Sequence, residues 1–450
     1  MRNAPADRWN RKHLHRRQVI IRVSPSTLSG EVLAPPSKSV MQRLVAGALL
    51  AKGTSTLHNI SQSDDCTASL MLAAQLGAEI ELGENSVVIK GTGGALSPRS
   101  TTLQPGESGL AARLFTPIAG LATEPLKISA ERSLMDRPMH PYEGIFKALG
   151  GELTTANGAF PVQVHKRLTG GYAHVNSPLS SQYISGLLFA LPVLDAPSTL
   201  AISNPTSTPY IELTLEVLAD FGIAIKAQSD FQRFHIQGGQ QFQAIETVVD
   251  GDWSGAAALA VAAMVAAESS LAIHGLHNQY TQADEAIRGA LLFAGGALSG
   301  IDDGIQVARR PVRAFDIDLR NAPDLFPVLA ALAAFGKKPS RLKGIGRLIH
   351  KESNRAVAIQ AAWSQLGIDV QLDWDKDEMR VQPWDIHSPG KQVRVSSCGD
   401  HRMAMALSIL GLGGRCEIEI TEAESVAKSY PEFFDDLETL GANLKVVQHE

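Results

Sequence analysis

The chain has 450 residues, long enough for two or three domains with a large buried core. Its 44% hydrophobic and 19% charged residues are typical of a globular protein and exclude an intrinsically disordered one. The formal net charge of -5 excludes nucleic-acid binding through overall charge, so any cationic site has to be assembled locally.

The N-terminal 17 residues are rich in arginine but contain no apolar stretch of the kind found in secretory signals. We expect residues 1–17 to form a disordered basic extension. A transit peptide is the weaker alternative, since Asp7 and the lack of serine argue against it. Three widely spaced cysteines, Cys66, Cys398 and Cys416, offer neither a disulfide framework nor a zinc spacing. This usage fits a reducing compartment, and we expect a cytoplasmic protein.

The chain contains an internal repeat that is marked by glycines. Six glycines follow one another at intervals of 72 to 74 residues: Gly77, Gly150, Gly222, Gly295, Gly367 and Gly441. Each ends a helix-like stretch, where the chain needs a left-handed residue and glycine adopts that conformation without steric cost. Two short strands with alternating apolar residues are predicted after each glycine, as at 87–89 and 162–164.

A second, more apolar helix lies upstream in each repeat. The six helices are expected to start near Ser39, Ser108, Ser181, Ser254, Asp324 and Asp400. Serine and aspartate are favoured there because their side chains accept hydrogen bonds from free N–H groups of the first turn. The most apolar stretch, 256–267, has about half of the roughly 20 residues that a membrane helix needs, so we expect a buried helix there.

Each repeat therefore predicts a strand–helix–strand–helix–strand–strand unit, and the predicted fold class is α/β. One such unit cannot bury its apolar faces alone, so we expect three units in each of two lobes. The chain should pass between the lobes at Pro35-Pro36 and at Asp250-Gly251. These crossings predict one lobe of residues 36–250 and a second of residues 18–35 plus 251–450.

The repeated helix starts carry the candidate chemistry. A helix N-terminus presents free N–H groups and about half a positive charge, so it binds phosphate and carboxylate. Eight cations lie at or near these starts: Lys38, Arg43, Arg113, Arg137, Lys351, Arg355, Arg402 and Lys428. The carboxylates Asp324, Glu352 and Asp400 stand beside them. Taken singly, each residue is explained as a surface charge or a helix cap; together they predict a cleft for strongly anionic metabolites.

Other chemistries lack their motifs. The chain has no G-x-x-x-x-G-K-[ST] P-loop. The glycine-rich segment 91–94 leads into a loop and not a helix, so it is no dinucleotide fingerprint. No H-E-x-x-H motif occurs, and we expect no metal site and no cofactor.

Nine segments, in order, carry a resemblance to a known family: Pro36-Ser37-Lys38-Ser39, Gly106-Glu107-Ser108-Gly109, Asp136-Arg137-Pro138, Ser180-Ser181-Gln182, Ser207-Thr208-Pro209-Tyr210, Pro323-Asp324, Lys351-Glu352-Ser353-Asn354-Arg355, Asp400-His401-Arg402-Met403-Ala404-Met405 and Lys428-Ser429-Tyr430-Pro431. From about Ser24 to Leu444 the chain resembles the 5-enolpyruvylshikimate-3-phosphate synthases. The resemblance implies two lobes of three βαβαββ units, each an inside-out α/β barrel, with the active site in the cleft between them. It also implies transfer of the enolpyruvyl group of phosphoenolpyruvate to the 5-hydroxyl of shikimate 3-phosphate. Phosphate leaves through a tetrahedral intermediate, without a metal, in chorismate and aromatic amino-acid biosynthesis.

The resemblance assigns roles residue by residue. The positions that match the shikimate 3-phosphate contacts are Lys38, Ser39, Arg43, Ser180, Ser181, Gln182, Ser207, Tyr210, Asp324 and Lys351. Those that match the phosphoenolpyruvate site are Lys38, Gly109, Arg137, Gln182, Glu352, Arg355, Arg402 and Lys428. The candidate catalytic residues are Asp324, Glu352, Lys38, Lys428 and His401. We expect Glu352 to protonate the methylene carbon, with a pKa raised by burial, and Asp324 to orient or deprotonate the substrate hydroxyl.

Several positions depart from the family pattern. Glu107, Leu110 and Leu114 replace an asparagine, a threonine and a proline. Arg347 falls near an asparagine that contacts substrate in the family, and Asn354 and Gly399 replace an aspartate and an asparagine. We expect these changes to preserve the reaction and to lower sensitivity to glyphosate, which competes with phosphoenolpyruvate in this family.

Two other functions stay open. A UDP-N-acetylglucosamine enolpyruvyl transferase shares the fold, but that family carries a reactive cysteine in a loop of the first lobe. No cysteine lies between Cys66 and Cys398. An inactive, ligand-binding paralogue is opposed by the retained Lys38, Asp324 and Glu352. We expect a monomer whose partners are two small-molecule substrates, with no nucleic acid and no membrane.

Overall fold

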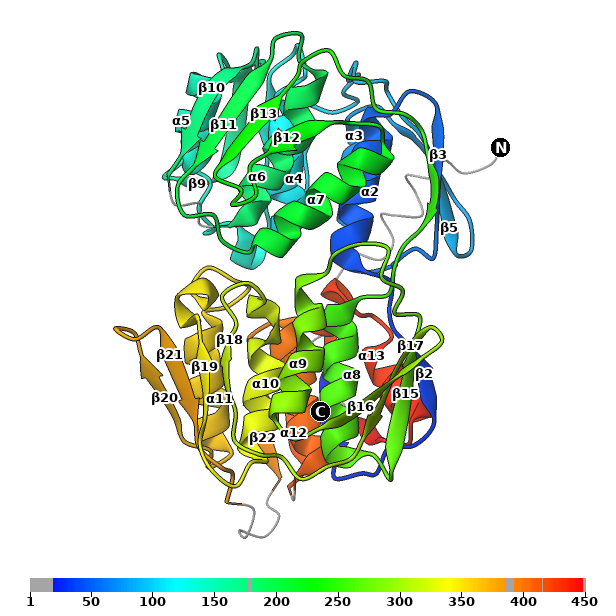
Figure 1. Ribbon diagram of the computed structural model, residues 1–450, viewed down its shortest axis with the longest axis vertical. Helices are drawn as coiled ribbons and strands as arrows, with labels where there is room; N and C mark the ends of the chain where they lie inside the picture. The colour runs from blue at the N-terminus through cyan, green and yellow to red at the C-terminus, as the bar shows by residue number, and fades with distance from the viewer. Residues whose placement is uncertain (1–18, 177–179, 386–391, 415, 448–450) are drawn as a thin grey trace.

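The computed structural model describes residues 19–176, 180–385, 392–414 and 416–447. These residues form two lobes, one above the other in Figure 1, and each lobe contains three four-stranded sheets. The predicted two-lobe α/β fold is confirmed. The extension predicted for residues 1–17 lies outside the described residues. Within the described ranges, no helix is long and apolar enough to cross a membrane.

The first lobe comprises, in chain order, α2 (Lys38–Leu50), β3 (Thr54–His58), α3 (Asp64–Gln75), β4 (Glu79–Leu82), β5 (Ser86–Lys90), β6 (Thr102–Leu103), α4 (Gly109–Ala119), β7 (Leu126–Ile128), η1 (Arg132–Leu134), α5 (Pro141–Ala148), β8 (Glu152–Ala156), β9 (Ala159–Lys166), β10 (Gly171–Val175), α6 (Ser181–Ala190), η2 (Leu191–Val193), β11 (Ser198–Ile202), α7 (Thr208–Asp220), β12 (Ile225–Ala227), β13 (Arg233–Ile236) and β14 (Glu246–Val248). Its sheets have the strand orders β14-β3-β5-β4, β6-β7-β9-β8 and β10-β11-β13-β12.

The second lobe comprises β1 (Ile20–Ser24), β2 (Glu31–Leu33), α8 (Trp253–Ala266), β15 (Ser270–His274), η3 (Ala283–Ala286), α9 (Ile287–Phe293), β16 (Ala297–Ile301), β17 (Gly304–Ala308), β18 (Asp316–Asp318), η4 (Pro323–Leu325), α10 (Phe326–Ala334), β19 (Ser340–Lys343), η5 (Ile345–Leu348), α11 (Arg355–Gln365), β20 (Val370–Asp373), β21 (Glu378–Val381), β22 (Val393–Ser396), α12 (His401–Gly413), β23 (Ile418–Thr421), η6 (Ala423–Lys428), α13 (Phe433–Thr439) and β24 (Asn443–Val447). Its sheets have the strand orders β16-β17-β15-β2, β18-β19-β21-β20 and β22-β23-β1-β24.

One pairing scheme recurs from sheet to sheet. In the second repeat β6 runs parallel to β7, β7 is antiparallel to β9, and β8 and β9 form an antiparallel pair. A parallel pair needs a crossover connection, which α4 supplies, whereas the last two strands are joined by a short turn. This scheme is the predicted βαβαββ unit.

The two lobes exchange the strands that precede their first helices. β2 comes before α2 in the chain but pairs with β15 of the second lobe, and β14 comes before α8 but pairs with β3 of the first. The two connecting segments run side by side, since Pro36 and Gly251 form an antiparallel bridge and the Ser37 N–H donates to the Asp250 carbonyl at 2.7 Å. The lobes are therefore connected by two hydrogen-bonded chain segments.

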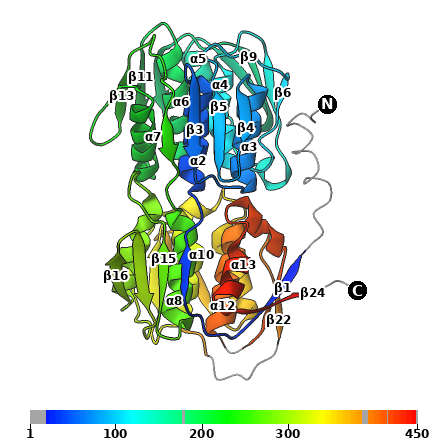
Figure 2. The ribbon, with the colours of Figure 1, turned by 90° about the vertical axis from the view of Figure 1, so that its right-hand side faces the viewer.

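Each lobe has its own apolar core around helices that lie inside the sheets. In the second lobe α8, α10 and α12 pack against one another, and in the first α4 packs against α2 and α6. These inner helices run roughly along the long axis of the molecule (Figure 2). Because sheets surround them, α8 is buried on nearly every side, which explains why its sequence has no polar face. The buried helix predicted around 256–267 is confirmed.

The repeat glycines end their helices as predicted. All six have a positive φ, between 77° and 116°, where any side chain would be strained. At the N-terminal ends, Ser108 and Asp400 cap α4 and α12 as expected. The caps of α2, α6 and α8 lie one or two residues before the predicted starts, at Ser37, Ser180 and Asp252.

A helix does start near Asp324, as predicted, but the prediction that Asp324 caps it is wrong. Asp324 lies in the 3-10 turn η4, and the α-helix α10 begins at Phe326. The Asp324 carboxylate accepts hydrogen bonds from Lys351 and Arg355, so these cations, and not backbone N–H groups, fix its position.

Candidate active site

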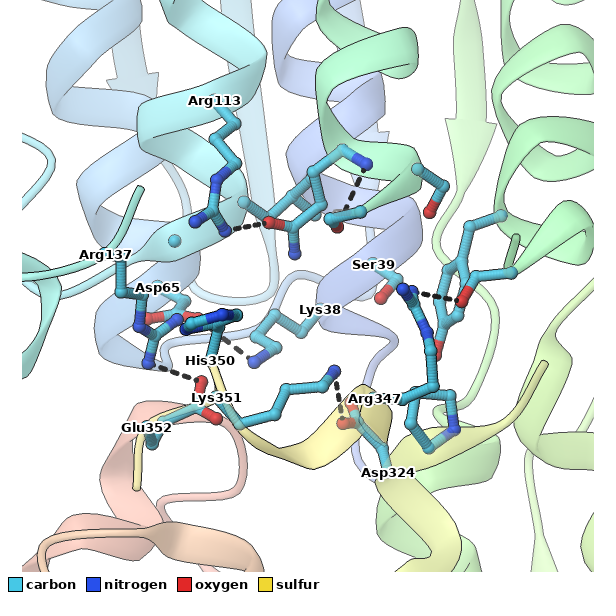
Figure 3. Close-up of a pocket in the computed structure, with 18 of the residues that line it drawn as sticks. Lys38, Ser39, Asp65, Arg113, Arg137, Asp324, Arg347, His350, Lys351 and Glu352 are labelled. Carbon is cyan, nitrogen blue, oxygen red and sulfur yellow. Dashed lines mark hydrogen bonds and ion pairs between the residues drawn. The ribbon is translucent and has the colours of Figure 1, made fainter. Parts of the chain in front are cut away.

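A cavity of about 230 Å³ lies between the two lobes. From the first lobe it is lined by Lys38, Ser39, Arg43, Asp65, Gly109, Leu110, Arg113, Arg137, Pro138, Ser180, Ser181, Gln182, Ser207 and Tyr210. From the second lobe it is lined by Pro323, Asp324, Gly346, Arg347, His350, Lys351, Glu352 and His401. Figure 3 shows cations and carboxylates of the two lobes pointing toward one another across this cavity.

Several helix starts meet at the cavity. The first residues of α2, α4, α6 and α12 are Lys38, Gly109, Ser181 and His401, and each lines it. The positive ends of these helix dipoles therefore face one shared space, as the repeat predicts. The starts of α8 and α10 are the exceptions among the six predicted helices. Ser254 bonds to Asp284 of its own lobe, and neither Ser254 nor Phe326, the first residue of α10, is a lining residue.

Arg355 organises the acidic side of the cavity. Its guanidinium donates to Asp324 at 2.6 Å and to Glu352 at 2.7 Å. It also donates to Asp400 at 2.8 Å, and the whole residue is only 1% exposed. Arg355 therefore lies behind the carboxylates and outside the set of lining residues, and its contact with phosphoenolpyruvate stays a prediction.

The surrounding cations keep Asp324 and Glu352 ionised. Burial by itself raises the pKa of Glu352, but Arg355, Arg137 and Lys428 together hold that pKa well below its usual range. Burial also raises the pKa of Asp324, and again its cationic neighbours outweigh the effect and hold the pKa well below normal. The prediction that burial raises the pKa of Glu352 is therefore wrong for this arrangement, because several cations outweigh desolvation.

Lys38 is held charged by a residue that the sequence did not suggest. Its ammonium donates to Asp65 at 3.0 Å, as Figure 3 shows. Burial lowers the pKa of Lys38, but Asp65, Glu352 and Asp324 raise it more, so the pKa lies above its usual value. The only sequence signal was an acidic pair at the start of α3, and acids in a first helical turn are common without any site.

Arg43 is fully engaged by the first lobe itself. Its Nε donates to the Thr214 hydroxyl at 2.9 Å, and its Nη1 donates to the Ser39 carbonyl at 2.8 Å. Its Nη2 lies 3.4 Å from the Ser185 hydroxyl and 3.3 Å from the Tyr210 carbonyl. Burial lowers the pKa of Arg43 to about 10, so it stays charged at neutral pH. Arg43 therefore supports the cavity wall as well as lining it.

Three cations of the predicted phosphoenolpyruvate set have buried nitrogens without such partners. Within the described ranges, Arg137 Nε and Nη2, Arg402 Nε and Lys428 Nζ are buried and have no hydrogen-bond partner. The closest opposite charges lie at 3.4 Å from Arg137 (Glu352), 3.6 Å from Lys428 (Glu107) and 3.8 Å from Arg402 (Asp324). Buried donors without acceptors cost free energy, which an anionic ligand would recover. Arg402 and Lys428 lie beside the cavity and not among its lining residues.

Glycine at position 109 allows Arg137 to lie against the start of α4. A Cβ atom on Gly109 would be 2.6 Å from Arg137 Nη1 and 3.6 Å from Arg113 Nη1. Leu110 lines the cavity, and Leu114 is completely buried in the core. The segment that departs from the family pattern thus adjoins the cationic side of the cavity.

Second-lobe side chains contact Ser207, which has a left-handed φ of 53°. The Ser207 N–H donates to Asn321 Oδ1 at 3.1 Å, and Arg347 Nη2 donates to the Ser207 hydroxyl at 3.0 Å. Sequence reasoning missed Asn321 and the lining residue His350, and it left Arg347 undecided. The hydrogen bonds of Asn321 and Arg347 to Ser207 join the two lobes, and no local sequence pattern reveals contacts between lobes.

The remaining predicted residues also come together here. Ser180 caps α6 by accepting from the Gln182 N–H, and the Gln182 side chain accepts from Arg113 at 2.8 Å. His401 is 1% exposed; burial and the charge of Lys38 hold its pKa well below its usual value, so it is neutral. Neutral His401 is therefore available to accept or donate one hydrogen bond.

A sequence model of the family described as EPSP synthase (3-phosphoshikimate 1-carboxyvinyltransferase) matches residues 23–437. The chain belongs to the EPSP synthase family. It is 32% identical over 425 residues to the 3-phosphoshikimate 1-carboxyvinyltransferase of Methanocorpusculum labreanum, covering 94% of this chain and 99% of the relative. It is 32% identical over 432 residues to the enzyme of that name from Aeropyrum pernix, covering 95% and 96%. The predicted family and enzyme class are confirmed.

Solved structures share the fold of this EPSP synthase family member. The EPSP synthase from Acinetobacter baumannii superposes with a TM-score of 0.78 at 24% identity, covering 96% of this chain and 100% of the other. The enolpyruvyl transferase NikO from Streptomyces tendae superposes with a TM-score of 0.74 at 16% identity, covering 96% and 99%. At these identities the likeness concerns the fold.

Proposed function

We propose that this chain transfers the enolpyruvyl group of phosphoenolpyruvate to the 5-hydroxyl of shikimate 3-phosphate and releases inorganic phosphate. The observation that carries the proposal is a group of buried cations with unpartnered donors beside two ionised carboxylates. A phosphomonoester carries about -1.5 to -2 charges, so with their two carboxylates the substrates bring roughly -5. Two such anions come together only where cations neutralise them.

The shikimate 3-phosphate contacts are assigned to the wall with many neutral polar groups. They are Lys38, Ser39, Arg43, Ser180, Ser181, Gln182, Ser207, Tyr210, Asp324 and Lys351, all of which line the one cavity. Hydroxyl and amide groups suit the hydroxyls of a cyclohexene ring, and the cations suit its phosphate and carboxylate.

The phosphoenolpyruvate contacts are assigned to the more strongly cationic side. They are Lys38, Gly109, Arg137, Gln182, Glu352, Arg355, Arg402 and Lys428. The unpartnered nitrogens of Arg137, Arg402 and Lys428 support this assignment, because an anion would supply the acceptors that the protein does not.

The reaction needs an acid and a base in one site. The 5-hydroxyl oxygen bonds to C2 of phosphoenolpyruvate while C3 takes a proton from Glu352, and Asp324 orients the hydroxyl and receives its proton. The tetrahedral intermediate then loses phosphate as C3 returns a proton to Glu352, which restores the double bond, and the departing phosphate takes up the proton held by Asp324. Lys38 and Lys428 stabilise charge on the attacking and departing oxygens. His401 stays a candidate for one hydrogen bond to the reacting groups.

Substrate binding itself would prepare Glu352 as an acid. The cations that hold its pKa down include Arg137 and Lys428, which are also assigned to phosphoenolpyruvate. Once the ligand's negative charge neutralises them, less positive charge opposes the effect of burial and the pKa of Glu352 rises. The carboxylate would therefore be protonated more readily when its substrate is bound.

We propose that two lobes, residues 36–250 and residues 18–35 plus 251–450, move together when substrate binds. Cations for the same ligands come from both units, so ligand binding would draw them together. Both walls of the cavity belong to one chain, which supports a monomeric enzyme.

Phosphate release tests the function. Mixing the enzyme with shikimate 3-phosphate, phosphoenolpyruvate and EDTA should release one phosphate per enolpyruvyl product; no release would contradict the proposal. Replacing shikimate 3-phosphate with UDP-N-acetylglucosamine should abolish release. Burial raises the pKa of the Cys66 thiol to about 12, so Cys66 does not provide the reactive thiol of that other transferase class.

A further inference from the structure

Glu107 places one carboxylate between cations of the two lobes. It lies in the loop before α4, one residue ahead of the cap Ser108. Its Oε2 is 3.6 Å from Nζ of Lys428, which ends η6 in the second lobe. Its Oε1 is 3.4 Å from Nη1 of Arg132, which starts η1 in the first lobe. The side chain therefore bridges the boundary between the lobes.

The two cations of this bridge have different surroundings. The Lys428 side chain is 6% exposed, whereas the Arg132 side chain is 69% exposed and Glu107 is 29% exposed. Lys428 Nζ has no hydrogen-bond partner among the described residues, and Glu107 at 3.6 Å balances its charge without completing a hydrogen bond. A ligand anion that reaches Lys428 with good geometry would make stronger contacts than Glu107 does.

The carboxylate can leave Lys428 without unfolding its loop. The backbone is held by the Ser108 N–H donating to the Pro105 carbonyl at 3.0 Å and by the Glu131 N–H donating to the Gly106 carbonyl at 3.0 Å. The Glu107 side chain is 29% exposed and already lies 3.4 Å from Arg132, so it can turn toward Arg132 and solvent while these backbone hydrogen bonds stay in place.

We propose that Glu107 is an internal counter-anion for Lys428, which the anionic group of phosphoenolpyruvate displaces when it binds. Glu107 thus weakens the binding of this ligand and stabilises the approach of the two lobes when no ligand is bound. The inference rests on the proposed function only in its assignment of Lys428 to phosphoenolpyruvate. Glu107 is a residue that sets affinity; it takes no part in the chemical step.

The test replaces Glu107 with glutamine, which keeps the shape and removes the charge. The Kd of phosphoenolpyruvate, measured by calorimetry on the full chain, should fall about twofold to fivefold, the scale of a partly exposed ion pair. The KM for phosphoenolpyruvate should fall in parallel while kcat changes less than about twofold. Glu131→Gln is the matched control: Glu131 is exposed beside the same loop, and no ion pair joins it to Lys428 in the described structure.

A double-mutant cycle ties the effect to Lys428. In a Lys428→Met background, Glu107→Gln should change the Kd of phosphoenolpyruvate less than about twofold. If Glu107→Gln prevents folding, Glu107→Asp shortens the side chain and should lower the Kd in the same direction. The inference is overturned if Glu107→Gln binds no more tightly than Glu131→Gln, or if its advantage persists without Lys428. Failure of the wild type to release phosphate would instead contradict the proposed function, and the binding comparison would still decide the role of Glu107.

Discussion

Arg43 and Arg137 are both buried arginines of the first lobe that line the same cavity, yet their surroundings differ. Every nitrogen of Arg43 has a neutral acceptor in its own lobe. Arg137 has two buried nitrogens without a hydrogen-bond partner among the described residues, and its nearest opposite charge is Glu352 of the other lobe. Burial and charge are therefore the same for both arginines. They differ in whether the protein itself supplies acceptors for the guanidinium nitrogens.

The difference assigns the two residues to different tasks. Each guanidinium nitrogen of Arg43 has a protein acceptor before any ligand arrives, so Arg43 stabilises the wall that carries Ser39 and Tyr210 in addition to its proposed contact with shikimate 3-phosphate. Arg137 gains acceptors only from a ligand or from closer approach of Glu352. Loss of Arg43 should first affect folding, and loss of Arg137 should first affect turnover.

The largest expected effect is on turnover, from Arg137→Ala. Removing one preorganised charge should lower kcat/KM by about two to three orders of magnitude, and Lys38→Ala should do the same. Lys52→Ala, an exposed position just beyond α2, is the control and should be nearly silent. Equal losses at all three positions in a steady-state assay would mean that the cavity is not the active site.

Arg43→Ala should lower the stability of the fold more than Arg137→Ala does. The variant leaves several buried acceptors unpaired and should lower the free energy of unfolding by on the order of 3 kcal/mol. Urea denaturation of Arg43→Ala beside Arg137→Ala measures the contrast. A variant at position 43 that is as stable as the wild type would remove the basis of the comparison.

Gly109→Ala tests the place of Arg137 without removing its charge. The added Cβ would lie 2.6 Å from Arg137 Nη1, so the guanidinium has to move. The displaced guanidinium should lose a hydrogen bond to the ligand anion, worth about 1.5 to 3 kcal/mol, so we expect the KM for phosphoenolpyruvate to rise about tenfold or more. Gly144→Ala in α5 is the control, since its Cβ would meet nothing within 4 Å. If the KM of Gly109→Ala is unchanged, Arg137 does not contact phosphoenolpyruvate.

The smallest effect is on stability as a function of pH. It should come from Glu352, the ion-pair partner of Arg137, and not from the partners of Arg43. The folded pKa of Glu352 is lower than in the unfolded chain, so its charge stabilises the protein above the unfolded pKa of about 4.3. That stability is lost as the pH falls through the folded pKa. Glu352→Gln should therefore be less stable than the wild type at pH 7, and the difference should shrink below about pH 4. The acceptors of Arg43 are neutral, so they should add no dependence of stability on pH. Urea midpoints of the wild type and Glu352→Gln, measured across this pH range, test the prediction.

Local structure followed from the sequence. The glycine spacing predicted six helix ends, and each of those glycines has the required positive φ. Alternating strands, apolar inner helices and most of the cavity residues were also predictable, because periodicity and capping act over only a few neighbours. The family resemblance then supplied roles for Lys38, Asp324 and Glu352.

Only the tertiary structure decided how charges and strands are partnered. The predicted crossings at Pro35-Pro36 and Asp250-Gly251 already assigned β2 and β14 to their lobes, but their pairing with β15 and β3 depends on packing that no local pattern encodes. Asp65 beside Lys38 and Glu107 beside Lys428 are contacts between separate elements, and the latter joins the two lobes. The low pKa of Glu352 has the same origin, since burial and cations act in opposite directions and only their three-dimensional arrangement determines which prevails.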